Sequence, residues 1–271
     1  MPELPEVETV VRVIGPKLRG RTIVDASFSV PRQLLPQTSA QIKRAIRGQT
    51  IQDVRRRGKY ILIELEKGLL VIHLRMTGRL YVRPVKAEGH PHERAWITLD
   101  HDYMLVLRDA RTLGTISAVK EASVFEDKLG WEPLLDSFPV AAVREKLHAR
   151  KMAIKPVLLD QKLWAGIGNI YASEILWEAQ ISPLKSAASL TRREIERMVA
   201  AVPMVLRRAV EKGGSTIRDF MGPEGEAGAY QKQFRVYDRA GLDCLRCGGE
   251  IVRVVQAQRS TYYCRKCQQK R

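Results

Sequence analysis

The chain has 271 residues, 45% of them hydrophobic, so it is long enough to form two domains with buried cores. Its 46 Lys and Arg residues outnumber its 30 Asp and Glu residues, and the net charge of +16 favours a polyanionic partner such as nucleic acid over a merely soluble basic surface. No run of 18 apolar residues and no apolar segment after a basic N-terminus occurs. We therefore expect a soluble protein of the cytoplasm or nucleoid, without a membrane span or secretory signal.

The first predicted element is an amphipathic helix that begins near residue 4. Gly15 and Pro16 either kink or end it, and Gly20 is the last position at which we expect it to stop. Its apolar residues recur at helical spacing: Leu4, Val7, Val10, Val11, Ile14 and Leu18. This stripe predicts that the helix packs against a sheet.

Pro2 stands directly before this helix. If Met1 is removed, Pro2 carries a secondary amine, and α-amino groups have a pKa of roughly 7.7–8.0, so a fraction is neutral near pH 7. A neutral amine beside a carboxylate, here Glu3 or Glu6, can attack a carbonyl-like carbon and form a Schiff base. The same residues also fit an ordinary start in which the acids stabilise the helix N-terminus.

The hydrophobic period then changes to two, which predicts a strand over residues 24–30. A short helix is expected over Ser39–Arg47. Further strands are predicted at 51–56, 59–65, 69–75, 79–83, 95–100, 103–108 and 115–119. Short strands at this spacing indicate an antiparallel β-sandwich, and the first helix must pack against or between its sheets.

Near residue 125 the pattern changes to helices, predicted at about 140–149, 154–163, 169–179 and 191–211. Thr191 and Glu194 have the spacing of a capping box. Gly166 and Gly168 allow a sharp turn before the third of these helices, and Asn169 can cap it. The free N–H groups there can bind an anion, although an ordinary helical hairpin is the alternative. A glycine-rich stretch after residue 213 predicts a long functional loop.

All four cysteines lie near the C-terminus in the pattern C-x2-C-x16-C-x2-C: Cys244, Cys247, Cys264 and Cys267. This spacing favours one structural zinc ion over two disulfides, and four sulfur ligands close the site to catalysis. Strands at 251–255 and 261–263 are expected to form a hairpin with a turn at 256–260. Arg259 would lie near its tip, as a phosphate ligand or as a solvated turn residue.

Four segments together resemble the formamidopyrimidine-DNA glycosylase family of bacteria, along essentially the whole chain. They are Met1–Val10, Ala165–Tyr171, Gly213–Thr216 and the four-cysteine end. The resemblance implies an α+β fold with an N-terminal helix and β-sandwich (1–125), a linker (126–139), a helix-two-turns-helix domain with a lesion-capping loop (140–235) and a zinc finger (236–271). It also implies one Zn²⁺, a monomer in the bacterial cytoplasm, and damaged double-stranded DNA as the partner.

The resemblance also implies a mechanism for the repair of oxidised purines. The damaged nucleotide is extruded because its C1′ is otherwise out of reach. Pro2 attacks C1′, the base leaves, and the resulting iminium promotes elimination of the 3′ and then the 5′ phosphate. Glu3 is the acid/base, Glu6 orients the amine and the lesion pocket, and Lys59 and Arg259 act on the lesion phosphates.

Further residues match the family's DNA contacts. Asn169, His90 and Lys155 correspond to backbone contacts, which position DNA without reading its sequence. Met76, Arg111 and Leu113 correspond to the residues that fill the duplex after extrusion. Thr216 and Arg218 are the candidates for the lesion pocket.

Three departures from the family pattern bear on these expectations. Leu113 replaces the usual Phe and loses its stacking face, while Thr112 replaces a common lysine. The glycines that usually flank the finger arginine are absent around Arg259. We expect the first two departures to alter intercalation and to remove one phosphate-reaching charge.

Three alternatives are open. An endonuclease VIII-like enzyme would apply the same chemistry to oxidised pyrimidines, but that group typically has Gly where Leu4 stands. A non-catalytic damaged-DNA-binding protein would not need the residues kept here, which are Pro2, Glu3, Lys59, Asn169 and Arg259. A tautomerase-like use of an N-terminal proline would need neither a basic surface nor a finger.

Overall fold

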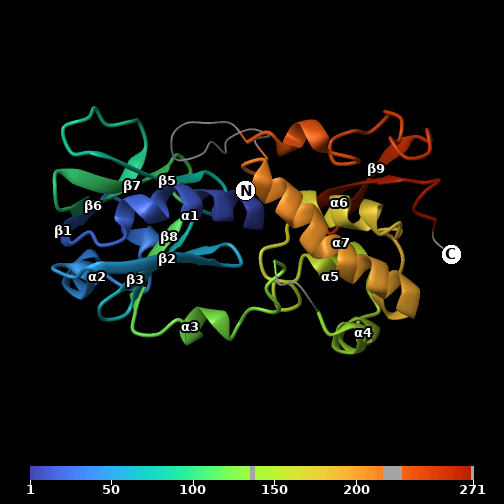
Figure 1. The fold of residues 1–271 in the computed structure, drawn as a ribbon, viewed down its shortest axis with the longest axis horizontal. Helices are drawn as coiled ribbons and strands as arrows, with labels where there is room; N and C mark the ends of the chain where they lie inside the picture. The colour runs from blue at the N-terminus through green and yellow to red at the C-terminus, as the bar shows by residue number, and fades with distance from the viewer. Residues whose placement is uncertain (135–137, 216–227, 270–271) are drawn as a thin grey trace. The chain divides into compact units, whose positions relative to one another are not determined.

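The computed structural model describes residues 1–134, 138–215 and 228–269. The chain divides into two compact units (Figure 1). Unit 1 comprises Met1–Asp127 and Gly213–Ala229, and unit 2 comprises Lys128–Lys212 and Tyr230–Arg271. Among the described residues, no helix is both long enough and apolar enough to cross a membrane.

Unit 1 contains two four-stranded antiparallel sheets, as the alternating pattern predicted. The first has the order β1-β6-β7-β5, with β1 Ile23–Phe28, β6 Glu93–Leu99, β7 Tyr103–Asp109 and β5 Gly78–Pro84. The second has the order β2-β3-β4-β8, with β2 Ile51–Arg57, β3 Tyr60–Leu65, β4 Leu69–His73 and β8 Thr115–Val119. The short helices η1 (Pro31–Gln33), α2 (Ser39–Ile46) and α3 (Ser123–Glu126) complete the unit.

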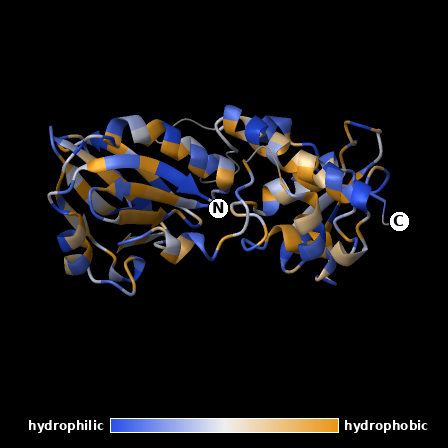
Figure 2. Cartoon of the chain, turned by 60° about the horizontal axis from the view of Figure 1, so that its bottom comes forward, coloured by the Kyte–Doolittle hydropathy of each residue, from blue (hydrophilic) through white to orange (hydrophobic). Residues whose placement is uncertain are grey.

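One hydrophobic core joins both sheets to helix α1 (Leu4–Leu18). Val10 and Ile14 of α1 lie in the same buried cluster as Ile97 of β6 and Ile61 of β3. Buried and half-buried residues alternate along β6, as a half-buried sheet requires, and Figure 2 shows both hydrophobic and hydrophilic residues in the strands. Helix α1 runs through Pro16 and ends at Leu18. The proline removes only one hydrogen-bond donor, and the helical bonding continues to Arg19, whose N–H bonds to the Gly15 carbonyl at 3.0 Å.

Unit 2 is helical and ends in a β-hairpin. Its elements are α4 (Val140–His148), α5 (Ile154–Leu158), α6 (Asn169–Glu178), η2 (Ala187–Ser189), α7 (Arg192–Glu211), η3 (Tyr230–Gln233), β9 (Ile251–Gln256) and β10 (Arg259–Cys264). The predicted helix over 154–163 was too long. The Asp160 carbonyl accepts the Leu163 N–H at 2.9 Å and the Asp160 carboxylate accepts the Lys162 N–H at 2.9 Å, so the chain turns there.

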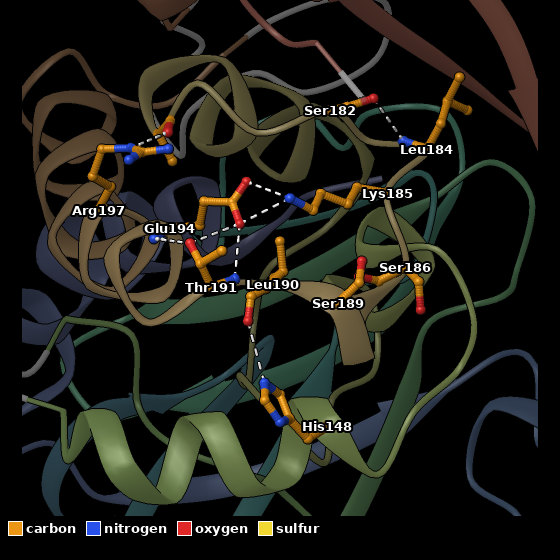
Figure 3. A network of polar contacts seen from close by, with 11 residues as sticks. His148, Ser182, Leu184, Lys185, Ser186, Ser189, Leu190, Thr191, Glu194 and Arg197 are labelled. Carbon is orange, nitrogen blue, oxygen red and sulfur yellow. Dashed lines mark hydrogen bonds and ion pairs between the residues drawn. The ribbon is translucent and has the colours of Figure 1, made fainter. Parts of the chain in front are cut away.

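A polar network fixes the start of α7 (Figure 3). Thr191 Oγ1 accepts the Glu194 N–H at 3.3 Å, and Glu194 Oε2 accepts the Thr191 N–H at 2.8 Å, which confirms the predicted capping box. Lys185 Nζ donates to Glu194 Oε1 at 2.8 Å, and the His148 ring contacts the Leu190 carbonyl at 3.2 Å. These bonds join α7 to the segment before it and to α4.

A second polar anchor holds the segment that leads to the hairpin. The Glu174 carboxylate on α6 is buried and accepts three backbone N–H groups, from Arg235, Val236 and Tyr237, at 2.9–3.0 Å. Burial raises the pKa of Glu174, and the three hydrogen bonds act against that rise. Buried carboxylates need such donors, so residues 235–237 are fixed against α6.

Candidate functional site

Pro2 and Glu3 lie buried at the start of α1, while Met1 is 44% exposed. Glu6, in the first turn, is also buried, and its Oε2 accepts the Glu3 N–H at 2.8 Å in a capping box. The sequence segment around Pro2 is therefore held in one conformation beside two buried carboxylates. A buried carboxylate can serve as an acid or a base for a neighbouring reacting group.

The other oxygen of Glu6 holds a segment that is distant in sequence. Glu6 Oε1 accepts the Ser215 N–H at 2.7 Å and the Ser215 hydroxyl at 3.0 Å. Gly214 has a φ of +75°, and a Cβ there would lie 2.8 Å from Glu6 Oε1, so only glycine fits. Ser215 was not predicted as a site residue, although it lies in a motif that the sequence analysis singled out. Thr216 and Arg218 lie outside the described residues.

Lys59 stands on the tight turn between β2 and β3, after Gly58 with its φ of 57°, and is 7% exposed. The turn lies beside His73 at the end of β4, whose ring packs edge-on against Tyr60 with 4.8 Å between centroids. Burial lowers the pKa of His73 to about 3, and the positive charges of Arg75 and Lys59 act in the same direction. His73 is therefore neutral, and its Nδ1 accepts the Arg75 N–H at 3.0 Å.

Met76 lies between β4 and β5, and Arg111 and Leu113 lie between β7 and β8. Met76 is 39% exposed and Leu113 is 42% exposed, so both apolar side chains are open to solvent. The two connections touch, because Arg111 N–H donates to Thr77 Oγ1 at 3.1 Å. The structure thus brings together three residues that lie up to 37 positions apart in the sequence (113 − 76 = 37).

A positive charge lies beside Thr112, where the sequence lacks the family's lysine. The Arg32 guanidinium, from η1, donates to the Thr112 hydroxyl and to the Arg111 carbonyl, the latter at 3.3 Å. Arg32 is exposed. The expected loss of charge at this loop is therefore offset by a residue from a different element, a replacement that only the tertiary fold reveals.

His90 is exposed on the connection between β5 and β6. Its N–H donates to Glu93 Oε1 at 3.0 Å, and its ring packs edge-on against Tyr81. Burial opposes ionisation of Glu93, but hydrogen bonds from Arg83, the His90 backbone, Tyr81 and Trp96 outweigh it and lower the pKa of this carboxyl to about 2. The ionised Glu93 thus anchors the segment that presents His90.

In unit 2, Lys155 and Asn169 are brought to the finger hairpin. Lys155 is 1% exposed, and its Nζ donates to Asn169 Oδ1 at 2.7 Å, the Ser260 carbonyl at 2.8 Å and Thr261 Oγ1 at 2.8 Å. Asn169 Nδ2 donates to the same Ser260 carbonyl at 3.0 Å. The prediction that Asn169 caps α6 was wrong. Gly168 is the N-cap, and the Asn169 side chain binds the hairpin instead.

Arg259 is exposed and is the first residue of β10. The turn before it is shorter than predicted, because only Ala257 and Gln258 separate the strands, with φ of 45° and 60°. Positive φ at both central residues is typical of a type I′ hairpin turn. Non-glycine residues occupy it here, so the absence of the family's glycines does not prevent a tight hairpin.

The four cysteines form a cluster that fits a zinc ion. All four sulfur atoms lie within 4.8 Å of one another, with 3.8 Å between Cys244 and Cys267 and 3.6 Å between Cys247 and Cys264. A tetrahedron of sulfurs about 2.3 Å from zinc has an edge of about 3.8 Å. Burial and the neighbouring sulfurs raise the pKa of Cys267 to about 12, so a cation is needed to bind all four as thiolates. The site binds one structural zinc ion.

Trp177 joins the cysteine cluster to α6. Its indole N–H donates to Cys244 Sγ at 3.3 Å, and Arg246 lies over its ring, 3.8 Å from the centroid. Burial opposes ionisation of Cys244, but this bond and two backbone bonds outweigh it and lower the pKa of the Cys244 thiol to about 6. Sequence reasoning did not identify Trp177, because a tryptophan near the end of a helix carries no motif for metal binding.

Three segments match protein families along the chain. Residues 1–116 match the formamidopyrimidine-DNA glycosylase N-terminal domain, residues 129–221 match the H2TH domain of that enzyme, and residues 241–270 match a zinc finger found in FPG and IleRS. Formamidopyrimidine-DNA glycosylases of Chloroflexus aggregans and Cronobacter sakazakii are each 42% identical to 99% of the chain, which covers 98% and 100% of them.

Solved structures agree. A Lactococcus lactis FPG mutant in complex with Fapy-dG-containing DNA has a TM-score of 0.92 and 36% identity, over 99% of this chain and 100% of that one. MutM in complex with carbocyclic 8-oxo-G-containing DNA has a TM-score of 0.91 and 36% identity over the same shares. The fold, the H2TH domain and the four-cysteine finger define a DNA glycosylase that acts in base excision repair and binds DNA.

The chain belongs to the formamidopyrimidine-DNA glycosylase family. Members of this family also cleave DNA at abasic sites, so the enzyme combines glycosylase and lyase activities. The α+β fold, the family and the zinc ion expected from the sequence are thereby confirmed.

Proposed function

We propose that this enzyme removes oxidised purines, such as 8-oxoguanine and formamidopyrimidines, from duplex DNA through a Schiff base at Pro2. The observation that carries the proposal is the fixed, buried start of α1. Glu6 binds the Glu3 N–H with one oxygen and Ser215 with the other, so Pro2 is held beside two carboxylates. A nucleophile that is positioned before reaction loses less entropy on reaching the transition state.

The chemistry follows from an unprotonated Pro2 amine, which exists only in chains that have lost Met1. The amine attacks C1′ of an extruded nucleotide, and the bond from C1′ to the base breaks. Glu3 moves protons as the sugar ring opens and the iminium forms. The iminium acidifies the adjacent C–H, so the 3′ phosphate leaves by β-elimination and the 5′ phosphate by δ-elimination. Water then releases the sugar fragment from Pro2.

The choice of oxidised purines is supported by the relatives. The similar structures hold DNA with Fapy-dG and carbocyclic 8-oxo-G, both oxidised purines, at TM-scores above 0.9. Leu4 agrees with this branch, since endonuclease VIII-like enzymes typically have Gly there. We assign Glu6, Thr216 and Arg218 to the lesion pocket.

We further propose that basic side chains on both units bind DNA phosphates. In unit 1 these are Lys59, His90 and Arg111. In unit 2, Arg259 binds a phosphate with its planar guanidinium, and Asn169 contributes a polar contact. The enzyme is proposed to act as a monomer, because each phosphate contact comes from its own chain.

Borohydride trapping tests the proposal. The enzyme is incubated with an 8-oxoguanine duplex and borohydride, with loss of Met1 verified by mass spectrometry. We expect a covalent adduct that Pro2→Gly abolishes and that Glu3→Gln reduces strongly. Tight binding without an adduct would contradict the proposal and indicate a non-catalytic damaged-DNA-binding protein. A duplex with an oxidised pyrimidine is the parallel substrate, and faster trapping on it would assign the endonuclease VIII-like specificity instead.

A further inference from the structure

Two connections of unit 1 carry the residues proposed to fill the DNA. Loop A (74–78) joins β4 to β5 and presents Met76. Loop B (109–114) joins β7 to β8 and presents Arg111 and Leu113. All three side chains are exposed, yet the residues at both ends of each loop are buried. The contacts that hold the two loops therefore determine how the three side chains are oriented.

One buried carboxylate lies beneath both loops. Asp109 has an exposed fraction of 0%. Its Oδ2 accepts the Gly114 N–H at 2.7 Å and Gln33 Nε2 at 3.0 Å, and its Oδ1 accepts the Thr77 hydroxyl. The three donors come from loop B, from η1 and from loop A. The carboxylate therefore gathers three segments that are separate in sequence, and its burial makes each of these bonds costly to lose.

Thr77 links the two loops directly. Its hydroxyl donates to Asp109 Oδ1 and accepts the Arg111 N–H at 3.1 Å. A hydroxyl can donate and accept at once, and an aliphatic side chain can do neither. Thr77 is the neighbour of Met76, and Arg111 is itself one of the filling residues. The bonds of one hydroxyl thus fix Met76 relative to Arg111.

The backbone of both loops requires such support. Arg75 has a φ of 50° and Thr112 a φ of 52°, in the left-handed region that favours glycine. A Cβ at Gly114 would lie 3.1 Å from Asp109 Oδ2 and 3.3 Å from the His73 carbonyl, so glycine allows the close approach of its N–H. Unfavourable backbone of this kind persists where surrounding contacts determine it.

We infer that Thr77 and Asp109 are positioning residues that join loops A and B into one rigid element, so that Met76, Arg111 and Leu113 enter the duplex together. The inference rests on the proposed function, in which these three side chains replace the extruded nucleotide. Rigid presentation lowers the entropy lost on binding. It matters especially here, because Leu113 lacks the aromatic face that would add stacking energy.

The test compares Thr77→Val with Thr77→Ser in the full-length enzyme. Stopped-flow fluorescence of 2-aminopurine beside an 8-oxoguanine measures base extrusion in an intact duplex and in one that lacks the nucleotide opposite the lesion. We expect T77V to slow extrusion about tenfold in the intact duplex, as for the loss of a hydrogen bond, and T77S to stay within about twofold of the parent enzyme. In the second duplex no opposing base has to be separated, so T77V should also stay within about twofold there.

Equal rates for T77V and T77S in the intact duplex would overturn the inference, and so would equal slowing of T77V in both duplexes, which would indicate a general structural defect. Thermal unfolding checks that each variant is folded. If T77V does not fold, Gln33→Leu replaces it, because Gln33 donates to Asp109 without belonging to either loop. Failure of the proposed function is distinguished by the parent enzyme, which would then form no borohydride adduct on the 8-oxoguanine duplex.

Discussion

Each unit contains a buried charge that joins segments carrying site residues, and these two charges have opposite signs. In unit 1 the Asp109 carboxylate, 0% exposed, accepts three hydrogen bonds. In unit 2 the Lys155 ammonium, 1% exposed, donates three. A buried charge is tolerated only when it is fully hydrogen-bonded, so both are fixed points of their unit.

The two arrangements differ in what they depend on. The donors to Asp109 belong to η1 and to loops whose ends are strands of the sandwich, all within unit 1. Two of the acceptors of Lys155, Ser260 and Thr261, lie more than 100 positions away on the hairpin that ends in Cys264. We therefore expect the two sets of hydrogen bonds to be lost under different treatments. Disruption of the hydrophobic core should break those of Asp109, and removal of zinc should break those of Lys155.

Zinc removal should give the largest effect and separate the two units. Stripping the ion with a chelator leaves four thiols that cannot all ionise together, so the hairpin loses its anchor and the acceptors of Lys155 move. We expect affinity for an abasic-site duplex to fall about a hundredfold, as for the loss of two charge-assisted contacts. Hydrogen exchange in β3 and β4 should stay unchanged.

The control is restoration by added Zn²⁺ after the same treatment. Full affinity after zinc loss verified by metal analysis would contradict the role given to the finger. Faster exchange in β3 and β4 would show that unit 1 also depends on zinc, and the comparison between the units would then fail.

Lys155→Met should give the next largest effect. The substitution keeps the length of the side chain and removes all three hydrogen bonds, which leaves buried acceptors unsatisfied. We expect unit 2 to lose about 3 kcal/mol of stability, visible as faster hydrogen exchange in α6 and β10. Lys151→Met is the matched control, because Lys151 is exposed on the same segment and carries the same charge.

The opposite result would favour the role expected from the family resemblance, in which Lys155 contacts DNA. A phosphate ligand would leave the stability of unit 2 unchanged and lower the salt dependence of DNA binding by about one charge. Measurement of affinity at several salt concentrations for both variants decides between a positioning lysine and a phosphate ligand.

Most of the fold could be predicted because burial follows periodicity. The strand expected at 95–100 is observed at Glu93–Leu99, where buried and half-buried residues alternate, since apolar residues on a two-residue period define a buried face. The helix expected over 154–163 ends at Leu158 instead. The turn that ends it is made by the carboxylate and carbonyl of Asp160, and the competition between such side-chain bonds and helix bonds is not visible in hydropathy.

The site was predictable where a motif carries the chemistry, as for the four cysteines. It was not predictable where a role depends on a distant partner. Asp109 and Trp177 act through residues 32 and 67 positions away, and nothing local distinguishes them from surface or core residues. Ser215 lies in a family motif, but its bond to Glu6 spans 209 positions and is not visible in that motif. The role of Lys155 was not predictable either. In a chain with many lysines, only the fold reveals that this one is buried.

A milder effect should come from His73, a base that unit 1 keeps neutral. Burial lowers the pKa of His73 to about 3, against about 6.5 in an unfolded chain. The unfolded state therefore binds more protons below pH 6.5, and the stability of unit 1 falls as the pH drops through this range. Between pH 7 and 5.5 we expect a loss of about 1.3 kcal/mol from this residue. Hydrogen exchange in β3 and β4 measures it.

His73→Asn isolates this contribution, because the asparagine carbonyl can still accept the Arg75 N–H but does not titrate. The difference in stability between parent and variant should shrink or reverse from pH 7 to 5.5. In unit 2 the buried acid Glu174 has a raised pKa, so its contribution to the stability of unit 2 increases as the pH falls. A pH-independent difference between parent and H73N would mean that His73 is not held neutral by burial, and the contrast between the two units would then rest on zinc alone.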